Sequence, residues 1–157
     1  MRHLAAVALL ALAGCANLSQ NTAPPATMPE NARPDLAAKW IRDGDFRWPP
    51  NDGFDGQGSY VVLPAGVLLD RFGSEHGRFF TPKGASFDAR ALPTVCASLT
   101  YTVYRVTSPL PVKIGGAAPW FDAPGGATQI KTDATAGQLV ADGVLRRVPA
   151  QRSPCTP

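Results

Sequence analysis

The clearest hydrophobic pattern in the chain lies at Leu99–Val106, LTYTVYRV, where apolar and polar residues alternate. Alternation with a period of two is typical of a strand that has one buried face. A second segment, Ser59–Leu63, ends at the turn-forming residues Pro64, Ala65 and Gly66. We predict five more strands: Val67–Phe72, Arg78–Thr81, Leu110–Ile114, Thr128–Lys131 and Val144–Val148.

One segment has the features of a helix. Thr135 is suited to cap a helix at Ala136–Asp142, and Gly143 is suited to end it. Pro109 and Pro111 predict an edge position for the strand that contains them, because proline donates no hydrogen bond to a neighbouring strand. We therefore predict a β-rich α+β fold, with a small mixed or antiparallel sheet as its core and few short helices.

The N-terminus, MRHLAAVALLALAGC, has the features of an export signal. A basic start precedes the apolar run Leu4–Leu12, which is too short to span a membrane. Because LAGC resembles a bacterial lipobox, residues 1–14 are predicted to be a lipoprotein signal peptide and Cys15 the lipidated first residue of the mature protein. An inner-membrane retention signal would usually have Asp directly after the lipidated Cys. This chain has Ala16 there, which favours the outer membrane or the cell surface. An ordinary signal peptide with an incidental Cys is the alternative.

The segment behind the signal is polar and rich in proline. Residues 15–39 are predicted to form a lipidated N-terminus and a flexible tether, and residues 40–157 one folded domain. Once Cys15 carries lipid, Cys96 and Cys155 remain, and an oxidising envelope compartment favours a disulfide between them. Two free thiols are the alternative.

Composition argues against several classes of function. The formal charge is +3 and no basic run is present, so no nucleic-acid partner is expected. Beyond residue 14 the chain contains one histidine, His76, and two glutamates, Glu30 and Glu75. This is too few for a zinc site, so no metal is expected, and no GxSxG elbow accompanies the histidine to suggest a Ser-His-Asp triad. The motifs of Rossmann and P-loop nucleotide sites are missing as well.

Several longer motifs occur in one order along the chain: WPPNDGF at 48–54, LPAGVLLDRFGSEHGRFFTPKG at 63–84, RALP at 90–93, YTVYRV and PLPV within 101–112, APWFDAPGGATQ at 118–129 and LVADGVLRRV at 139–148. Together they resemble the tuberculosis necrotizing toxin domain family over nearly the whole predicted domain. The resemblance implies a compact β-rich domain that hydrolyses NAD+, and also NADP+, to nicotinamide and ADP-ribose. NAD+ is then the substrate, and no separate cofactor is implied.

The chemistry of this bond narrows the search for catalytic residues. Nicotinamide leaves as a neutral base, so the barrier lies in building positive charge on the ribose and in placing a water. The resemblance implies catalytic roles for Arg71, whose guanidinium can grip a diphosphate, and for Gln129, whose amide can bind ribose hydroxyls or steer a water. The alternatives are an ion pair of Arg71 with Asp70, Glu75 or another carboxylate, and a surface position for Gln129 on a strand.

Substrate binding has candidates of two kinds, aromatic walls and additional polar groups. Phe79, a ring in GRFF, could stack on nicotinamide, and Arg90 of RALP could bind phosphates. Trp120 and Phe121 of PWF could form the wall of a pocket beside the flexible Gly-Gly pair. Core packing is the alternative for the aromatics, a structural ion pair for the Arg, and a solvated loop for the histidine. The candidates are Phe79, Arg90, Trp120, Phe121 and His76.

The leading interpretation is an envelope-anchored NAD+ glycohydrolase with a toxin or effector role. Its expected partners are the dinucleotide, the membrane through the lipid anchor, and a cognate inhibitor protein. Some relatives are expected to use a His in or near the strand where this chain has Thr102. The alternatives are a non-catalytic surface lipoprotein that binds NAD+ or ADP-ribose, a structural lipoprotein, and an ADP-ribosyltransferase.

Overall fold

The computed structural model describes residues 27–149 and 151–155 of the 157-residue chain. The predicted signal peptide, the predicted lipidation site Cys15 and the first part of the predicted tether lie outside the described residues. Within the described ranges, no helix is long and apolar enough to cross a membrane.

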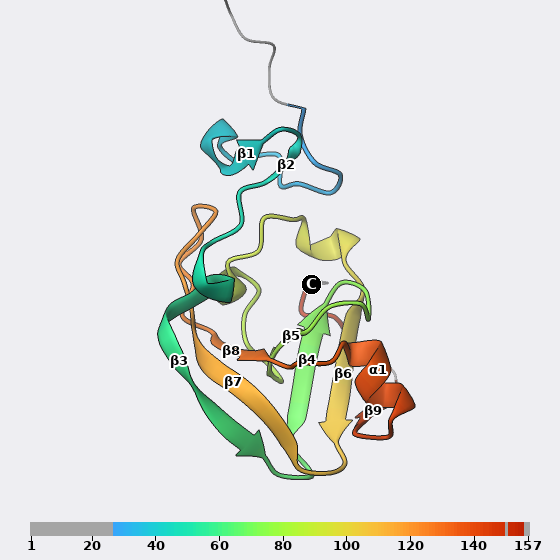
Figure 1. The fold of residues 1–157 in the computed structure, drawn as a ribbon. Coiled ribbons are helices and arrows are strands. Elements are labelled where there is room, and N and C mark those ends of the chain that lie inside the picture. The colour runs from blue at the N-terminus through green and yellow to red at the C-terminus, as the bar shows by residue number, and fades with distance from the viewer. Residues whose placement is uncertain (1–26, 150, 156–157) are drawn as a thin grey trace, which may run out of the picture.

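A seven-stranded antiparallel sheet forms the body of the fold (Figure 1). Its strands lie in the order β3-β7-β8-β5-β4-β6-β9, and each neighbouring pair is antiparallel. This arrangement confirms the predicted β-rich α+β class. The strands, in chain order, are β3 (Phe54–Leu63), β4 (Leu68–Phe72), β5 (Phe79–Pro82), β6 (Tyr101–Val106), β7 (Leu110–Ala117), β8 (Thr128–Lys131) and β9 (Leu145–Arg147).

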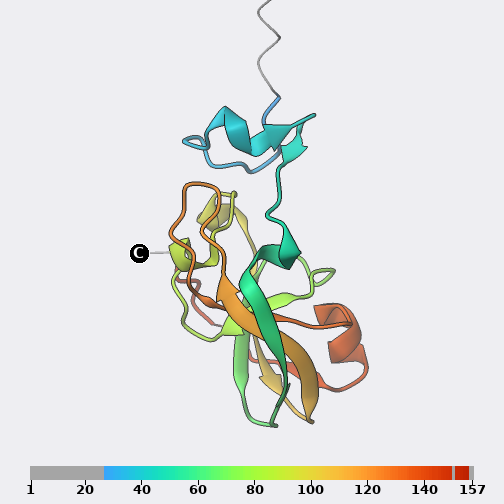
Figure 2. The same ribbon diagram turned by 60° about the vertical axis from the view of Figure 1, so that its left-hand side comes forward.

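The remaining elements are short, as the many glycines and prolines suggest. Strands β1 (Ile41–Arg42) and β2 (Asp45–Phe46) pair into a small second sheet. Figures 1 and 2 show this small sheet at one end of the main sheet. The helices are α1 (Ala136–Ala141) and the 3-10 turns η1 (Ala38–Trp40), η2 (Asn51–Gly53), η3 (Asp88–Arg90) and η4 (Cys96–Ser98).

Helix α1 begins where the sequence predicts. The Thr135 hydroxyl accepts a hydrogen bond from the backbone N–H of Gln138 at 3.2 Å. The side-chain oxygen of Gln138 accepts one from the backbone N–H of Thr135 at 2.9 Å. This reciprocal pair is a capping box, which satisfies two backbone donors at the start of the helix. Leu139 of α1 then packs into the main core with Leu69, Phe80 and other buried residues of the sheet.

The predicted edge position of Leu110–Ile114 is wrong. Strand β7 lies between β3 and β8 and continues to Ala117. The prolines are tolerated because β8 pairs only with Lys113–Gly116, so Pro111 lies beyond the stretch that has a neighbour on both sides. The edge strand on this side of the sheet is instead β3, which begins at Phe54, ahead of the predicted start at Ser59.

The packed region also begins earlier than the predicted boundary at Trp40. Ala32 forms a β-bridge with Thr94, and Leu36 is buried in a second apolar cluster with Ile41 and Phe121. The predicted tether therefore ends before Ala32, because the few apolar residues behind it pack against loops of the domain. The small sheet and its flanks are thereby attached to the main body.

Cys96 and Cys155 form a disulfide, as predicted. The bond joins η4 to the C-terminal segment across 59 residues of chain. A crosslink of this span restricts the unfolded chain, which raises the free energy of unfolding.

Removing the disulfide should lower the free energy of unfolding by about 4 kcal/mol in the chain-entropy model. The Cys96→Ser, Cys155→Ser double variant and the reduced native protein are compared by urea denaturation. Both should lose similar stability, whereas a native protein that is unaffected by reduction would contradict the expectation.

Candidate active site

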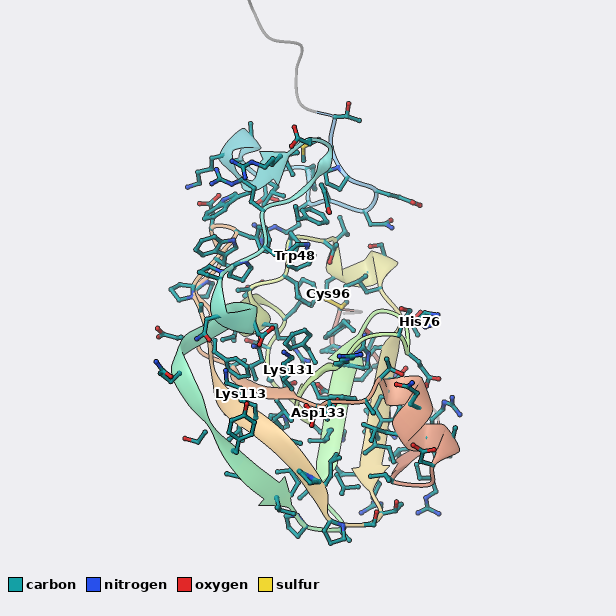
Figure 3. The ribbon with its side chains drawn as sticks, in the orientation of Figure 1. Trp48, His76, Cys96, Lys113, Lys131 and Asp133 are labelled. Atoms are coloured by element: carbon teal, nitrogen blue, oxygen red, sulfur yellow. A yellow bond between two sulfur atoms is a disulfide. The ribbon has the colours of Figure 1, made fainter. Side chains whose placement is uncertain are left out.

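One cleft gathers most of the candidate residues. It has a volume of about 510 Å³ and lies between the main sheet and the segment that follows the small sheet. Figure 3 shows Trp48, one of its lining residues, between the two sheets. The lining is formed by Trp48, Pro49, Asp52, Gly53, Arg71, Phe72, Phe79, Phe80, Thr81, Arg90, Ala91, Leu92, Ala117, Ala118, Trp120, Phe121 and Gln129.

Six of the seven predicted catalytic and substrate-binding residues line this cleft, although they come from distant parts of the chain. The seventh, His76, does not line it. His76 is exposed on the loop between β4 and β5, near the edge that carries α1 (Figure 3). The six are Arg71, Phe79, Arg90, Trp120, Phe121 and Gln129.

Arg71 is a buried cation that has no ion-pair partner among the described residues. Its side chain enters the cleft from β4, is 7% exposed, and donates to the Phe79 carbonyl oxygen at 3.3 Å. Its Nε has no hydrogen-bond partner, and within the described ranges no carboxylate lies within 4.0 Å of the guanidinium. Burial lowers the pKa of Arg71, but an arginine remains protonated at neutral pH. The cleft therefore presents a positive charge to an anionic ligand.

The loop between β4 and β5 determines where that charge lies. A side chain at Gly77 would overlap with both terminal nitrogens of Arg71, so only glycine leaves room for the guanidinium. Gly77 is outside the left-handed region of backbone conformation, so another residue would cause no backbone strain there. Its missing side chain thus serves the position of Arg71.

Replacing Gly77 with Ala should displace the guanidinium and lower kcat/KM by about 100-fold, the loss that a misplacement of about 1 Å can cause. Stability should change by less than about 1 kcal/mol, because the end of an arginine side chain can move aside. Activity assays and thermal melting measure the two effects. Gly116→Ala on β7 is the matched control, since its nearest neighbour would be 3.9 Å away. A fully active Gly77→Ala protein would contradict this reading of the loop.

Gln129 lies on β8, directly beside the small 3-10 turn η2. Its side-chain nitrogen donates to the backbone carbonyl of Asp52 at 2.9 Å, and Gly53 lies against its amide. This bond fixes the amide, so the oxygen is the side-chain atom left to accept from a ligand. Gln129 is half-buried and lines the same cleft as Arg71. A surface position away from the cleft is thereby excluded for this residue.

Arg90 also lines the cleft, but its charge is already paired. Its guanidinium lies 2.7 Å from the fully buried carboxylate of Asp70 and packs on the ring of Phe72. Asp70 also accepts from the hydroxyls of Thr81 at 2.6 Å and Tyr101 at 2.8 Å. Burial raises the pKa of Tyr101 to about 12, so this hydroxyl remains a donor. The structural ion pair considered for Arg90 is therefore present at the cleft wall.

The aromatic wall is held by the N-terminal segment. Trp120 donates from its indole nitrogen to the Arg47 carbonyl at 2.7 Å, and its ring lies 5.0 Å from that of Trp40. Phe121 is completely buried, and its carbonyl accepts from Arg33 at 2.5 Å. Phe121 thus combines the two roles weighed for it, because it packs in a core cluster and closes one side of the cleft.

Phe79 is the exposed member of the aromatic set. It is 41% exposed at the cleft, and the amine of Lys131 lies 6.0 Å from its ring centroid. Core packing is excluded for this residue, unlike for its neighbour Phe80, which is 2% exposed. An exposed ring beside a cleft is a suitable stacking surface for a planar base.

Sequence reasoning missed Trp48 and Asp52 as cleft residues. Both lie in the motif WPPNDGF, so the signal was present, but the motif was assigned no role. Asp52 is the one carboxylate that lines the cleft in the described part of the chain, and its Oδ2 lies 2.7 Å from the amine of Lys131. A pair of carboxylates of the kind that many glycosidases use is therefore not formed by the described lining residues.

Comparison with known proteins identifies the family of this chain. The family model described as tuberculosis necrotizing toxin matches residues 62–148, more than half of the chain. The chain belongs to the tuberculosis necrotizing toxin family. The family match includes both Arg71 and Gln129. Trp48 and Asp52 lie outside it, so the fold adds a wall to the cleft from beyond the matched region.

Individual relatives extend the comparison. A conidial surface nicotinamide adenine dinucleotide glycohydrolase of Aspergillus fumigatus is 39% identical over 127 residues, covering 70% of this chain and 54% of the relative. The chain thus spans about half the length of that curated relative. The solved structure of tuberculosis necrotizing toxin with its immunity factor has a TM-score of 0.56 at 23% identity, covering 65% of this chain and 61% of the other, and shares the fold. Tse6 in complex with Tsi6 gives a TM-score of 0.44 at 22% identity, covering 62% and 77%.

Proposed function

We propose that this protein is an NAD+ glycohydrolase that cleaves the bond between nicotinamide and ribose and also accepts NADP+. The main support is that the fold brings Arg71 and Gln129 into the same cleft, together with an aromatic wall. Family membership and the 39% identical relative named as a nicotinamide adenine dinucleotide glycohydrolase support the same reaction. The products would be nicotinamide and ADP-ribose.

The proposed roles follow from the charges of the cleft. Arg71, unpaired and buried, binds the anionic diphosphate and holds the dinucleotide in place. The exposed ring of Phe79 stacks on the nicotinamide. Gln129, fixed by the Asp52 carbonyl, uses its oxygen to orient a ribose hydroxyl or the attacking water. No proton donor is needed for the leaving group, which departs as a neutral base.

We further propose that the enzyme acts at the cell envelope. This rests on the lipobox-like sequence ahead of Cys15, and on a relative named as a conidial surface enzyme. A toxin or effector role is proposed from the family, and a cognate inhibitor from the immunity factor found with one structural neighbour. Mass spectrometry of the N-terminal peptide from membrane fractions tests the anchor, since a diacylglycerol on Cys15 has a distinct mass.

The reaction itself is tested by incubating purified protein with NAD+ or NADP+ and measuring released nicotinamide. Equal amounts of nicotinamide and free ADP-ribose are expected. Nicotinamide without free ADP-ribose, with label attached to protein in a lysate, would indicate a transferase. Calorimetric binding of NAD+ without any nicotinamide release would indicate a binding protein instead.

A further inference from the structure

Glu75, in the loop that contacts Arg71, is held by the guanidinium of Arg147 on β9. Glu75 accepts from Arg147 of β9 through both carboxylate oxygens, at 2.7 Å from Nε and 2.5 Å from Nη2. It also accepts from the hydroxyl of Tyr104 at 2.9 Å. Burial raises the pKa of Tyr104 to about 12, so this hydroxyl is a permanent donor at neutral pH. The two donors direct the carboxylate toward β6 and β9.

The same loop contacts Arg71 two residues later, at Gly77. The backbone of the loop is attached to α1 independently of Arg147, because the Ala136 amide donates to the Gly77 carbonyl and the Gly137 amide to the Glu75 carbonyl, both at 2.9 Å. The loop backbone can therefore remain in place when the Arg147 side chain is removed. The Glu75 carboxylate then keeps its contact with Tyr104 but loses both contacts with Arg147, which leaves its second oxygen without the donor that directs it.

Glu75 is the acid that could neutralise Arg71. Its carboxylate accepts from Tyr104, and Tyr104 lies on the same face of the paired strands β4 and β6 as Arg71, because Arg71 pairs with Thr102 and Leu69 with Tyr104. In agreement with this proximity, the charge of Arg71 is among the causes that lower the pKa of Glu75, after the hydrogen bond from Arg147. Asp70, the chain neighbour of Arg71, is already paired with Arg90. A carboxylate released from Arg147 would thus find in Arg71 a buried cation without a partner.

We propose that Arg147 is a positioning residue that holds Glu75 away from Arg71, so that the Arg71 guanidinium stays available to the anionic diphosphate of the substrate. Arg147 itself is more than half exposed and does not line the cleft, so it acts on the ligand only through Glu75. Naming the diphosphate rests on the function proposed above. The competition between the two arginines for Glu75 is a property of the free protein.

A double-mutant cycle in the full-length protein tests this competition. Arg147→Met should raise KM for NAD+ about tenfold with little change in kcat, a coupling within the range for contacting residues. Glu75→Gln should leave KM near the native value. The double variant Arg147→Met, Glu75→Gln should return KM to within about twofold of Glu75→Gln alone. Arg146→Met on the same strand is the matched control, since Arg146 forms no ion pair with any residue that the structure describes.

A spectroscopic measurement makes the test independent of catalysis. The Nε–Hε resonance of Arg71, assigned by its loss in Arg71→Met, should shift in Arg147→Met and return in the double variant. A double variant that stays as weak as Arg147→Met, or an Arg71 resonance unmoved in Arg147→Met, would overturn the proposal. A native protein that releases no nicotinamide would contradict the proposed function, while the Arg71 resonance would still decide this inference.

Discussion

Replacing Arg71 with Met is expected to lower kcat/KM for NAD+ hydrolysis by roughly 100- to 1,000-fold, with the protein fully folded. Removing one partner of a buried, charge-assisted contact costs about 2–5 kcal/mol, and each 1.36 kcal/mol is a factor of ten in rate. Because the diphosphate is already bound before the reaction, most of the loss should appear as a raised KM.

Stability separates this effect from a folding defect. In the described part of the chain, the Arg71 guanidinium is buried with an unpartnered Nε and no ion pair, so its removal ends an unfavourable burial of charge. The Tm of Arg71→Met should therefore equal or exceed that of the native protein. Arg71→Lys should be intermediate in activity, since lysine keeps the charge and loses the fork of donors. Native kcat/KM in Arg71→Met would remove Arg71 from the site.

The ion pairs around Arg71 show which contacts can be predicted from neighbouring positions in the sequence and which cannot. Asp70 was a natural partner for Arg71 by proximity in sequence, but consecutive residues of a strand point to opposite faces. Asp70 therefore meets Arg90, which arrives from a 3-10 turn, and not Arg71. The alternation along a strand can be read from a sequence. The position of Arg90 beside Asp70 depends on the path of a loop, which no short motif encodes.

Most strands were predictable because their patterns are local. The alternation at Tyr101–Val106 and the capping residues of α1 determine those elements within a few positions. The place of β7 inside the sheet was not predictable, because it depends on how much of β8 pairs beside Pro111. Sheet order is a tertiary property, and proline excludes only the particular hydrogen bond that it lacks.

The residues of the cleft, like the strands, could be predicted from the sequence only in part. Arg71, Phe79 and Gln129 were found through motifs, but Trp120 and Phe121 of the lining are packed from behind by a segment with little apolar character. Leu36 and Trp40 pack there only because Phe121 and Trp120 offer them a surface. A polar, proline-containing stretch reads as a tether until the partner surface is known. The N-terminal segment therefore helps to fix the aromatic wall of the site.

Replacing Gln129 with Ala is expected to lower kcat by about 100-fold and to change KM little, because a group that orients a hydroxyl or a water acts mainly in the transition state. The half-buried side chain makes one described hydrogen bond, to Asp52, so Tm should change little. Gln57→Ala, an exposed glutamine on β3, is the matched control for the substitution itself.

Gln129→Glu tests whether activity requires the amide group or only the size and shape of the side chain. The variant keeps the size of the side chain, but a carboxylate cannot donate to the Asp52 carbonyl and would be repelled by it. It should therefore be as inactive as Gln129→Ala, even though a negative charge near the ribose would favour a cationic transition state. High activity in Gln129→Glu would mean that the site works by charge stabilisation and not by a fixed neutral amide. The contrast in KM and kcat between the Arg71 and Gln129 variants then tests whether binding and chemistry are divided between these two residues of the cleft.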